Sequence, residues 1–247
     1  MNKQLIDIFN DNKAGKITKW NHYFDIYEEF FSRYRGSDVR ILEFGVFQGG
    51  SLKMWREYFG DNCTIYGVDI NDECKKFEEN GIEIFIGDQE DRGFLKEIAQ
   101  KIGTVDIVID DGGHTMKQQI NTFEEIFPSV DKDGIYLVED LHTSYWPDYE
   151  YGGGYKNKKS FIEYSKNFID YINAWQSKSV RLNINKFTES VESLHYYDSV
   201  LVIKKKMMSP HMLVENGKVL ISEYKNTESS IPMRIKRKIY NILKKDK

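Results

Sequence analysis

The sequence predicts an α/β protein whose strands form a doubly wound, mostly parallel sheet with helices on both faces. Short apolar segments alternate with amphipathic segments of helical period throughout residues 39–138. Within this region, Ile107-Val108-Ile109 and Ile135-Tyr136-Leu137-Val138 are apolar without alternation, which is typical of strands buried on both faces. Glycine and acidic residues follow the ends of these segments, where open α/β sheets bind their ligands.

Five strands and four helices are expected in the alternating region. The strands are expected at residues 39–44, 64–68, 82–86, 105–109 and 134–138. The helices are expected between them, at residues 51–59, 73–79, 92–102 and 116–127. The repeated strand–helix–strand pattern implies right-handed connections and a parallel sheet that is covered by helices on both faces.

Helical segments flank the alternating region on both sides. Two of them, at residues 3–10 and 20–34, are expected to form an N-terminal helical cap over residues 1–36. The main domain is expected to span residues 37–204 and to contain a further helix at 160–175.

The end of the main domain is predicted to add antiparallel strands. Two segments, 179–187 and 194–203, follow one another without an intervening helix, so they are expected to pair as a hairpin. The result is a Rossmann-like mixed sheet of about seven strands. Residues 205–247 are expected to hold a small hairpin, formed by 211–214 and 218–221, and a basic amphipathic tail.

Composition narrows the classes of function. The chain has 247 residues, of which 40% are hydrophobic and 30% charged, as in a soluble globular protein. No apolar segment approaches the roughly 20 residues that span a bilayer, and the first residues do not lead into a signal peptide, so a cytoplasmic location is expected. The net charge is −4, but residues 231–247 hold seven basic residues and one acidic residue. The acidic remainder argues against nucleic acid as the substrate.

The ends of the first three strands carry residues suited to a nucleoside. The first strand runs into a glycine-containing turn that allows close backbone approach to a ligand. The second ends at an acid that can hold ribose hydroxyls, and the third ends in polar groups suited to an adenine edge. The expected ligand-binding residues are Glu43, Gly45, Gly49, Ser51, Asp69, Asp88 and Gln89. The alternative is that the glycines only form a turn. A dinucleotide site is disfavoured, because Gly45-x-x-x-Gly49-Gly50 is not Gly-x-Gly-x-x-Gly.

The fourth and fifth strands end in acidic residues that are expected to converge. Asp110 and Asp111 end one strand, while Glu139 and Asp140 end its neighbour. Crowded carboxylates repel one another unless they are protonated or bind a cation, and oxygen ligands favour Mg²⁺ first and Ca²⁺ or Mn²⁺ next. Since successive strand residues point to opposite faces, we expect Asp111 to bind the metal and Asp110 to face the cofactor.

His114 follows the fourth strand in the same turn. An imidazole beside a metal can take a proton from a hydroxyl that the metal has made more acidic. His114 is therefore a candidate general base, with Asp111 as its catalytic partner through the metal. The alternative is that His114 only begins the following helix.

Five stretches of the sequence resemble a known family, at residues 42–55, 66–70, 87–89, 106–114 and 138–146. They are similar to the class I, metal-dependent sugar O-methyltransferases that modify antibiotics, of the mycinamicin and elloramycin type. The resemblance covers about residues 18–203, and the Asp-Asp-Gly-x-His motif with the Glu-Asp pair is its most specific part. It implies a Rossmann-like methyltransferase fold with S-adenosyl-L-methionine and Mg²⁺, or another hard divalent cation, as cofactors.

The resemblance also implies roles for particular residues and partners. By position, Asp111, Glu139 and Asp140 would bind the metal, His114 would be the base, and His22 and Tyr23 would close over the cofactor. The acceptor would be a hydroxyl of a sugar or polyol, in a glycan precursor or a glycosylated metabolite. A homo-oligomer is compatible with the resemblance. The alternatives are a methyltransferase of a non-sugar small molecule and a non-catalytic nucleoside-binding module.

The basic tail carries two interpretations. Residues 232–245 place isoleucine and leucine on one helical side among lysine and arginine, which fits weak contact with the inner membrane surface or docking to a partner enzyme. The alternative is a solvated terminus.

Overall fold

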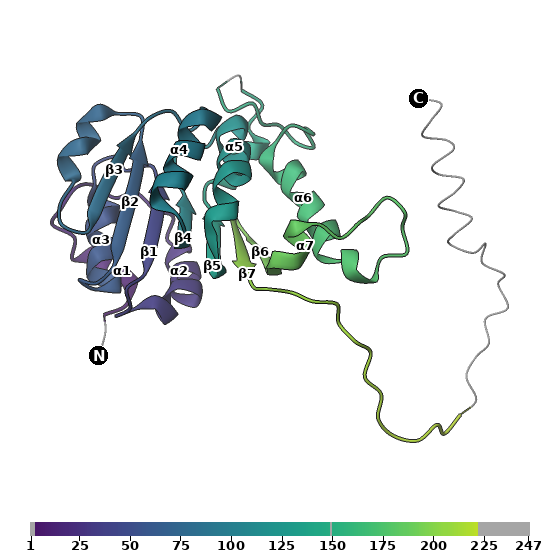
Figure 1. Ribbon diagram of the computed structural model, residues 1–247. Coiled ribbons are helices and arrows are strands. Elements are labelled where there is room, and N and C mark those ends of the chain that lie inside the picture. Colours follow the sequence, from purple (N-terminus) through teal and green to yellow (C-terminus); the bar gives the residue numbers. More distant parts are fainter. Residues whose placement is uncertain (1–2, 149, 222–247) are drawn as a thin grey trace.

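A seven-stranded sheet forms the centre of the molecule, for which the computed structural model describes residues 3–148 and 150–221. Its strands are β1 (Arg40–Phe44), β2 (Thr64–Asp69), β3 (Ile82–Ile86), β4 (Val105–Asp110), β5 (Val130–Val138), β6 (Val191–Tyr197) and β7 (Val200–Lys205). Their order is β3-β2-β1-β4-β5-β7-β6 (Figure 1). The first five are parallel, and β7 is antiparallel to both its neighbours. The predicted doubly wound mixed sheet is confirmed.

Helices cover both faces of this sheet (Figure 1). The α-helices are α1 (Leu5–Asn10), α2 (Tyr23–Phe31), α3 (Gly50–Phe59), α4 (Arg92–Ile102), α5 (Met116–Ile126), α6 (Phe161–Ile172) and α7 (Lys186–Ser190). Five short 3-10 helices are η1 (Ser32–Tyr34), η2 (Asp72–Phe77), η3 (Phe127–Ser129), η4 (Leu141–Tyr145) and η5 (Ala174–Gln176). None of these described helices is long and apolar enough to span a membrane.

The two faces of the sheet carry separate apolar cores. On one face, α1, α2 and α3 pack around Trp55, Tyr27 and Phe31 against alternate strand residues such as Ile41. On the other, α4, α5 and α6 pack against the intervening residues, with Phe123 in contact with Tyr136. The expected helices before the sheet thus share a core with its strands.

The C-terminal part of the sheet differs from the prediction in its boundaries. Residues 179–187 form no strand; they run as turns and irregular chain into α7. The hairpin instead lies wholly within β6 and β7, and its turn is Asp198-Ser199, where Ser199 adopts a φ of 62°. The polar residues Asp198 and Ser199 therefore form a turn inside an otherwise apolar segment. As a result, the segment predicted as one strand at 194–203 contains parts of two strands, β6 and β7.

The small hairpin predicted at 211–214 and 218–221 is wrong. These residues are exposed and contain no strand, and Figure 1 shows the chain leaving the sheet after β7. An isolated two-stranded hairpin without a covered apolar face is at best marginally stable, which accounts for the difference. The basic tail at 232–245 lies outside the described residues.

Candidate functional site

The turn after β1 is shaped by its contact with the turn after β4. The order of strands reverses between β1 and β4, so their C-terminal loops diverge and leave a crevice between them. Gly45 has a φ of 90°, and a Cβ atom there would lie 2.0 Å from the carbonyl oxygen of Asp111. Glycine is thus needed at this position for both its conformation and its lack of a side chain.

Asp69, at the end of β2, holds the same turn from the other side. Its Oδ2 accepts hydrogen bonds from the backbone N–H groups of Val46 (3.0 Å) and Phe47 (2.9 Å). Its Oδ1 accepts one from the N–H of Asn71 at 2.9 Å. The carboxylate therefore fixes the glycine turn at the mouth of the crevice.

Two adjoining hollows follow this edge of the sheet. The larger, of about 440 Å³, is lined by Gly45, Ser51 and Asp69, together with residues of the turns after β4 and β5. The smaller, of about 100 Å³, is lined by Asp88 and Gln89 and shares Gly45, Asp69 and Gly112 with the larger. Five of the residues predicted to hold a nucleoside thus line one continuous crevice, although their role in binding stays a prediction.

Glu43 and Asp110 are buried below this crevice. Glu43 accepts hydrogen bonds from Ser51 Oγ (2.9 Å) and Trp55 Nε1 (3.1 Å), which tie β1 to α3. Asp110 accepts one from Gln89 Nε2 at 2.6 Å. Burial raises the pKa of each carboxyl to about 7. Neither side chain lines the hollows, nor does Gly49, so these predicted cofactor contacts have no direct geometric support.

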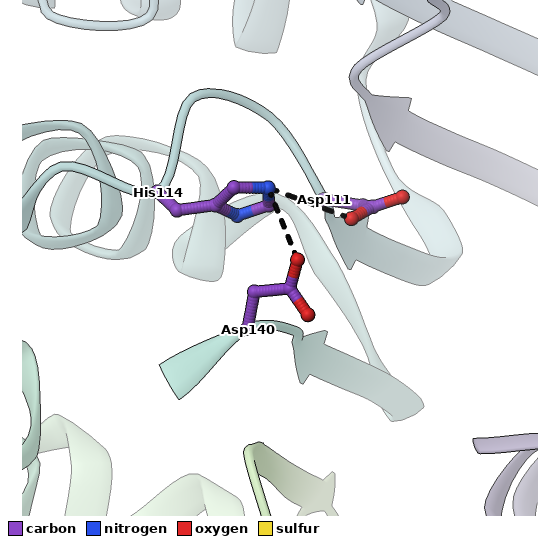
Figure 2. Close-up of side chains that lie close together, drawn as sticks. All are labelled: Asp111, His114 and Asp140. Carbon is purple, nitrogen blue, oxygen red and sulfur yellow. Dashed lines mark ion pairs between the residues drawn. The ribbon is translucent and has the colours of Figure 1, made fainter. Parts of the chain in front are cut away.

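Asp111, His114 and Asp140 form a compact cluster at the ends of β4 and β5. Figure 2 shows the His114 ring pointing toward both carboxylates. Its Nε2 lies 3.4 Å from Asp140 Oδ2 and 3.8 Å from Asp111 Oδ1. One ligand atom from each residue lies within 4.8 Å of the others, so the three could hold a metal ion.

The local backbone brings these side chains together. His114 and Asp140 both have positive φ, 56° and 53°, which is uncommon for residues with a side chain and often found at functional sites. Thr115 then begins α5 with a capping box to Gln118. Across the cluster, Gln119 Nε2 donates to the backbone oxygen of Glu139 at 3.1 Å, which joins α5 to the end of β5.

The donor chemistry of this cluster fits a divalent cation. Two carboxylates and an imidazole suit Mg²⁺ or Mn²⁺, although nitrogen is less typical for Mg²⁺. His114 Nδ1 is buried and has no hydrogen-bond partner among the described residues. Burial is the main cause that raises the pKa of Asp111 to about 6 and of Glu139 to about 7. A cation would relieve the cost of ionising such carboxyls.

Glu139 is predicted to bind the metal together with Asp111 and Asp140, but in the structure its carboxylate contacts other side chains. It is 1% exposed and accepts hydrogen bonds from Tyr27 OH (2.6 Å) and Lys19 Nζ (2.8 Å). Lys19 Nζ also donates to Asp111 Oδ2. An ammonium group therefore lies between two of the three predicted metal ligands.

Sequence reasoning missed both partners of Glu139. Lys19 belongs to residues 12–20, here called the strap, which contains no helix or strand and therefore no periodic signal. Tyr27 was detectable, because it lies four residues after Tyr23 and so shares its side of the helix. Tyr23 OH donates to Asp140 Oδ1 at 2.7 Å, and the two tyrosines thus reach consecutive acids.

His22 and Tyr23 do not line the crevice, contrary to their predicted position over the cofactor. His22 Nε2 lies 2.9 Å from the carbonyl oxygen of Asp198 in the β6–β7 turn. Tyr23 lines a third hollow, of about 390 Å³, together with Trp20 and His142; this hollow adjoins the larger one at the acidic residues. Their predicted contact with the cofactor therefore lacks geometric support in this structure.

Aromatic rings border this third hollow. The Trp20 and His142 ring centroids lie 5.9 Å apart, and those of His142 and Trp146 lie 5.0 Å apart. Trp20 and Trp146 are 56% and 42% exposed. Exposed aromatic faces beside a hollow are suited to stacking on the apolar face of a ring-shaped ligand.

Comparison with known sequences finds sugar O-methyltransferases. No model of a protein family matches the chain. A rhamnosyl tetracenomycin-C 2'-O-methyltransferase of Streptomyces olivaceus is 33% identical over 204 residues, covering 78% of this chain and 53% of the relative. The mycinamicin VI 2''-O-methyltransferase of Micromonospora griseorubida is 35% identical over 191 residues, covering 72% and 47%. The chain thus spans about half the length of these curated relatives.

Comparison with solved structures agrees. The methyltransferase MycE of the mycinamycin biosynthetic pathway, in complex with Mg and SAH, superposes with a TM-score of 0.75. The two are 31% identical, and the match covers 84% of this chain and 55% of MycE. MycE with Mg, SAH and mycinamycin VI gives a TM-score of 0.73 at 32% identity, covering 83% of this chain and 54% of MycE.

Proposed function

We propose that this chain, a relative of the antibiotic sugar O-methyltransferases with their Rossmann-like methyltransferase fold, transfers a methyl group from S-adenosylmethionine to a hydroxyl of a sugar-containing small molecule. The observation that carries the proposal is the cluster of Asp111, His114 and Asp140 at the edge of a crevice of nucleoside size. In this proposal residues 37–204 form the catalytic domain, and the cap at 1–36 borders its acceptor side.

The crevice along β1, β2 and β3 is the proposed cofactor site. Asp69 would hold the ribose hydroxyls, while Asp88 and Gln89 would meet the adenine in the smaller hollow. The cofactor supplies a methyl group on a positively charged sulfur. Glu43 and Asp110 would act from beneath, because Ser51 and Gln89, which they hold, line the hollows.

Asp111 and Asp140 are the proposed core of a divalent cation site. A bound cation supplies Lewis acidity that lowers the pKa of a nearby hydroxyl. Glu139 would join the ligands only if its contacts with Lys19 and Tyr27 changed.

His114 is the proposed general base. Its pKa is lowered below the usual value, mainly by burial, and this favours the neutral imidazole, which can accept a proton. The same geometry also suits His114 as a third ligand, because its Nε2 faces both carboxylates. Metal affinity of a His114→Ala variant separates the two roles, since a base can be removed without loss of the cation.

The hollow beside Trp20 and His142 is the proposed acceptor site. It shares Asp111 and Asp140 with the cofactor crevice, so an acceptor hydroxyl there would lie beside the proposed cation site and face the methyl donor across it. Positioning of this kind supplies much of the rate in a displacement. Trp20→Ala should raise the KM for the acceptor several-fold, whereas Trp175→Ala should not, because Trp175 lies in η5 and does not line the hollow.

Methyl transfer to sugar-containing acceptors tests the proposal. The protein is incubated with S-adenosylmethionine, Mg²⁺ and a panel of nucleotide sugars and rhamnosylated or macrolide glycosides. Mass spectrometry then follows the gain of one methyl group. EDTA should stop the transfer and Mg²⁺ should restore it. Transfer that continues in EDTA would remove the cation from the mechanism. Binding of S-adenosylmethionine without transfer to any acceptor would favour the alternative of a non-catalytic nucleoside-binding module.

A further inference from the structure

The Lys19 side chain occupies an unusual position for a surface-type residue. It is 2% exposed, and its ammonium group bridges Glu139 Oε2 and Asp111 Oδ2. Its Nζ also lies 5.9 Å from the centre of the Tyr27 ring. These two contacts with carboxylates neutralise part of the acidic cluster.

The strap links this ion pair to the proposed cofactor crevice. Residues Lys16, Ile17, Thr18 and Lys19 line the larger hollow, and Thr18 and Lys19 also line the acceptor hollow. A Cβ atom on Gly15 would lie 1.7 Å from the carbonyl oxygen of Gln48, so the strap presses directly on the glycine turn. One short segment thus contacts the cofactor loop at one end and the acidic cluster at the other.

Little besides the Lys19 ion pairs fixes the middle of the strap. In the described part of the chain, the backbone N–H and C=O groups of residues 16–19 make no hydrogen bond. Ile17 packs against the apolar core. Movement of Lys19 would therefore break two charged contacts but no backbone ladder.

We infer that Lys19 is the counter-ion of the acidic cluster before a divalent cation binds, and that the cation displaces the ammonium and with it the strap. A cation held by Asp111 would share this carboxylate with Lys19, so two positive charges would lie within a few ångströms and repel strongly. Departure of the ammonium would also free Glu139 from Lys19. Lys19 is thus a positioning residue that couples cation binding to the wall of the cofactor crevice. This inference rests on the proposed metal-dependent function.

Chemical labelling of wild-type protein tests the displacement without a substitution. Lysine amines are methylated reductively at pH 8 with and without saturating Mg²⁺, and peptide mass spectrometry gives the rate at each site. Lys19 should be protected without the cation and labelled faster with it. Exposed Lys16 should react in both states, while Lys205, buried against the carbonyl oxygen of Val130, should react in neither. Unchanged protection of Lys19 with Mg²⁺ bound overturns the inference.

Cation affinity provides the second readout. Lys19→Met keeps an unbranched side chain without the charge. Lys13→Met is the matched control, because Lys13 is exposed in the same strap and lines neither hollow. If the ammonium occupies the cluster in nine molecules of ten, its removal should tighten Mg²⁺ or Mn²⁺ binding about tenfold by calorimetry. The control should change little. Equal affinity of Lys19→Met and wild type overturns the inference.

The proposed function and this inference fail in different ways. Wild-type protein that binds no cation and transfers methyl groups in EDTA contradicts the metal-dependent function itself. Wild-type protein that binds Mg²⁺ and needs it for transfer, with Lys19 still protected, contradicts only the role of Lys19.

Discussion

His114 is the residue on which the proposed proton transfer depends most directly. His114→Ala should retain cofactor and cation binding but lose about 10²–10⁴-fold in turnover, which is the usual contribution of a positioned base. The remaining rate should rise with pH, because hydroxide can replace the base. In wild type, turnover should fall on acidification as the imidazole becomes protonated.

The behaviour of His114→Ala also distinguishes the other roles that His114 could have. Turnover close to wild type would remove His114 from the mechanism. Loss of Mg²⁺ affinity by calorimetry, together with turnover, would instead identify it as a ligand.

Glu43 provides a test of the electrostatics beneath the crevice. Burial raises its pKa to about 7, above the value near 4.3 expected in an unfolded chain. Such a carboxyl stabilises the fold below pH 4, and this contribution is lost as the pH rises through 7. The full difference between these two pKa values corresponds to a loss of roughly 4 kcal/mol.

Glu43→Gln should therefore flatten the pH dependence of stability. Urea unfolding at pH 5, 6, 7 and 8 in EDTA should show a smaller decline in the variant than in wild type. Glutamine can keep contacts with both Ser51 and Trp55, so the fold should persist. Exposed Glu97→Gln in α4 is the matched control. Identical slopes in Glu43→Gln and wild type would contradict the assigned pKa.

At the scale of elements, the contact between the turns after β1 and β4 sets the geometry of the site. Gly45→Ala should destabilise the protein through its positive φ and through the 2.0 Å approach to the carbonyl oxygen of Asp111. Gly103→Ala is the matched control, because Gly103 has a φ of 67° but open space around its Cβ position. Each should cost about 1–3 kcal/mol for the unfavourable backbone conformation, and Gly45→Ala about 1–3 kcal/mol more for the clash.

Ligand binding distinguishes these two glycine variants further. Displacement of the Asp111 backbone should weaken Mg²⁺ and S-adenosylmethionine binding in Gly45→Ala but not in Gly103→Ala, as measured by calorimetry on the folded proteins. If both variants lose the same stability and both still bind their ligands, the close contact between the turns after β1 and β4 does not set the geometry of the site.

The elements that sequence reasoning predicted well are those with a strong periodic signal. The five parallel strands alternate with segments of helical period, and their ends carry the acids that the fold brings to one edge. The late hairpin was misplaced because Ser179–Phe187 resembles a strand in composition, although its residues are largely exposed. The role of the strap could not be predicted, because the residues that Lys19 contacts, Asp111 and Glu139, lie about a hundred residues further along the chain.

At the scale of the whole molecule, the sheet should govern the order of local opening. Hydrogen exchange should be slowest in β1 and β4, which have hydrogen-bonded strands on both sides and helices on both faces. It should be faster in β3 and β6, which form the two edges. Mass spectrometry of peptic peptides measures these rates. Protection of β6 equal to that of β4 would indicate that a second chain covers this edge.

The contact between the strap and the glycine turn also limits how this sequence can change over evolution. A Cβ atom on Gly50 would lie 2.1 Å from the carbonyl oxygen of Gly15, and one on Gly15 would meet Gln48. A side chain at either position forces the same separation of strap from turn. Once one substitution has moved the strap, the second side chain meets less steric clash. The double variant should therefore lose less stability than the two single variants lose together. The two glycines thus form a single epistatic unit. In the double variant, restoring glycine at one of the two positions alone should recover little stability.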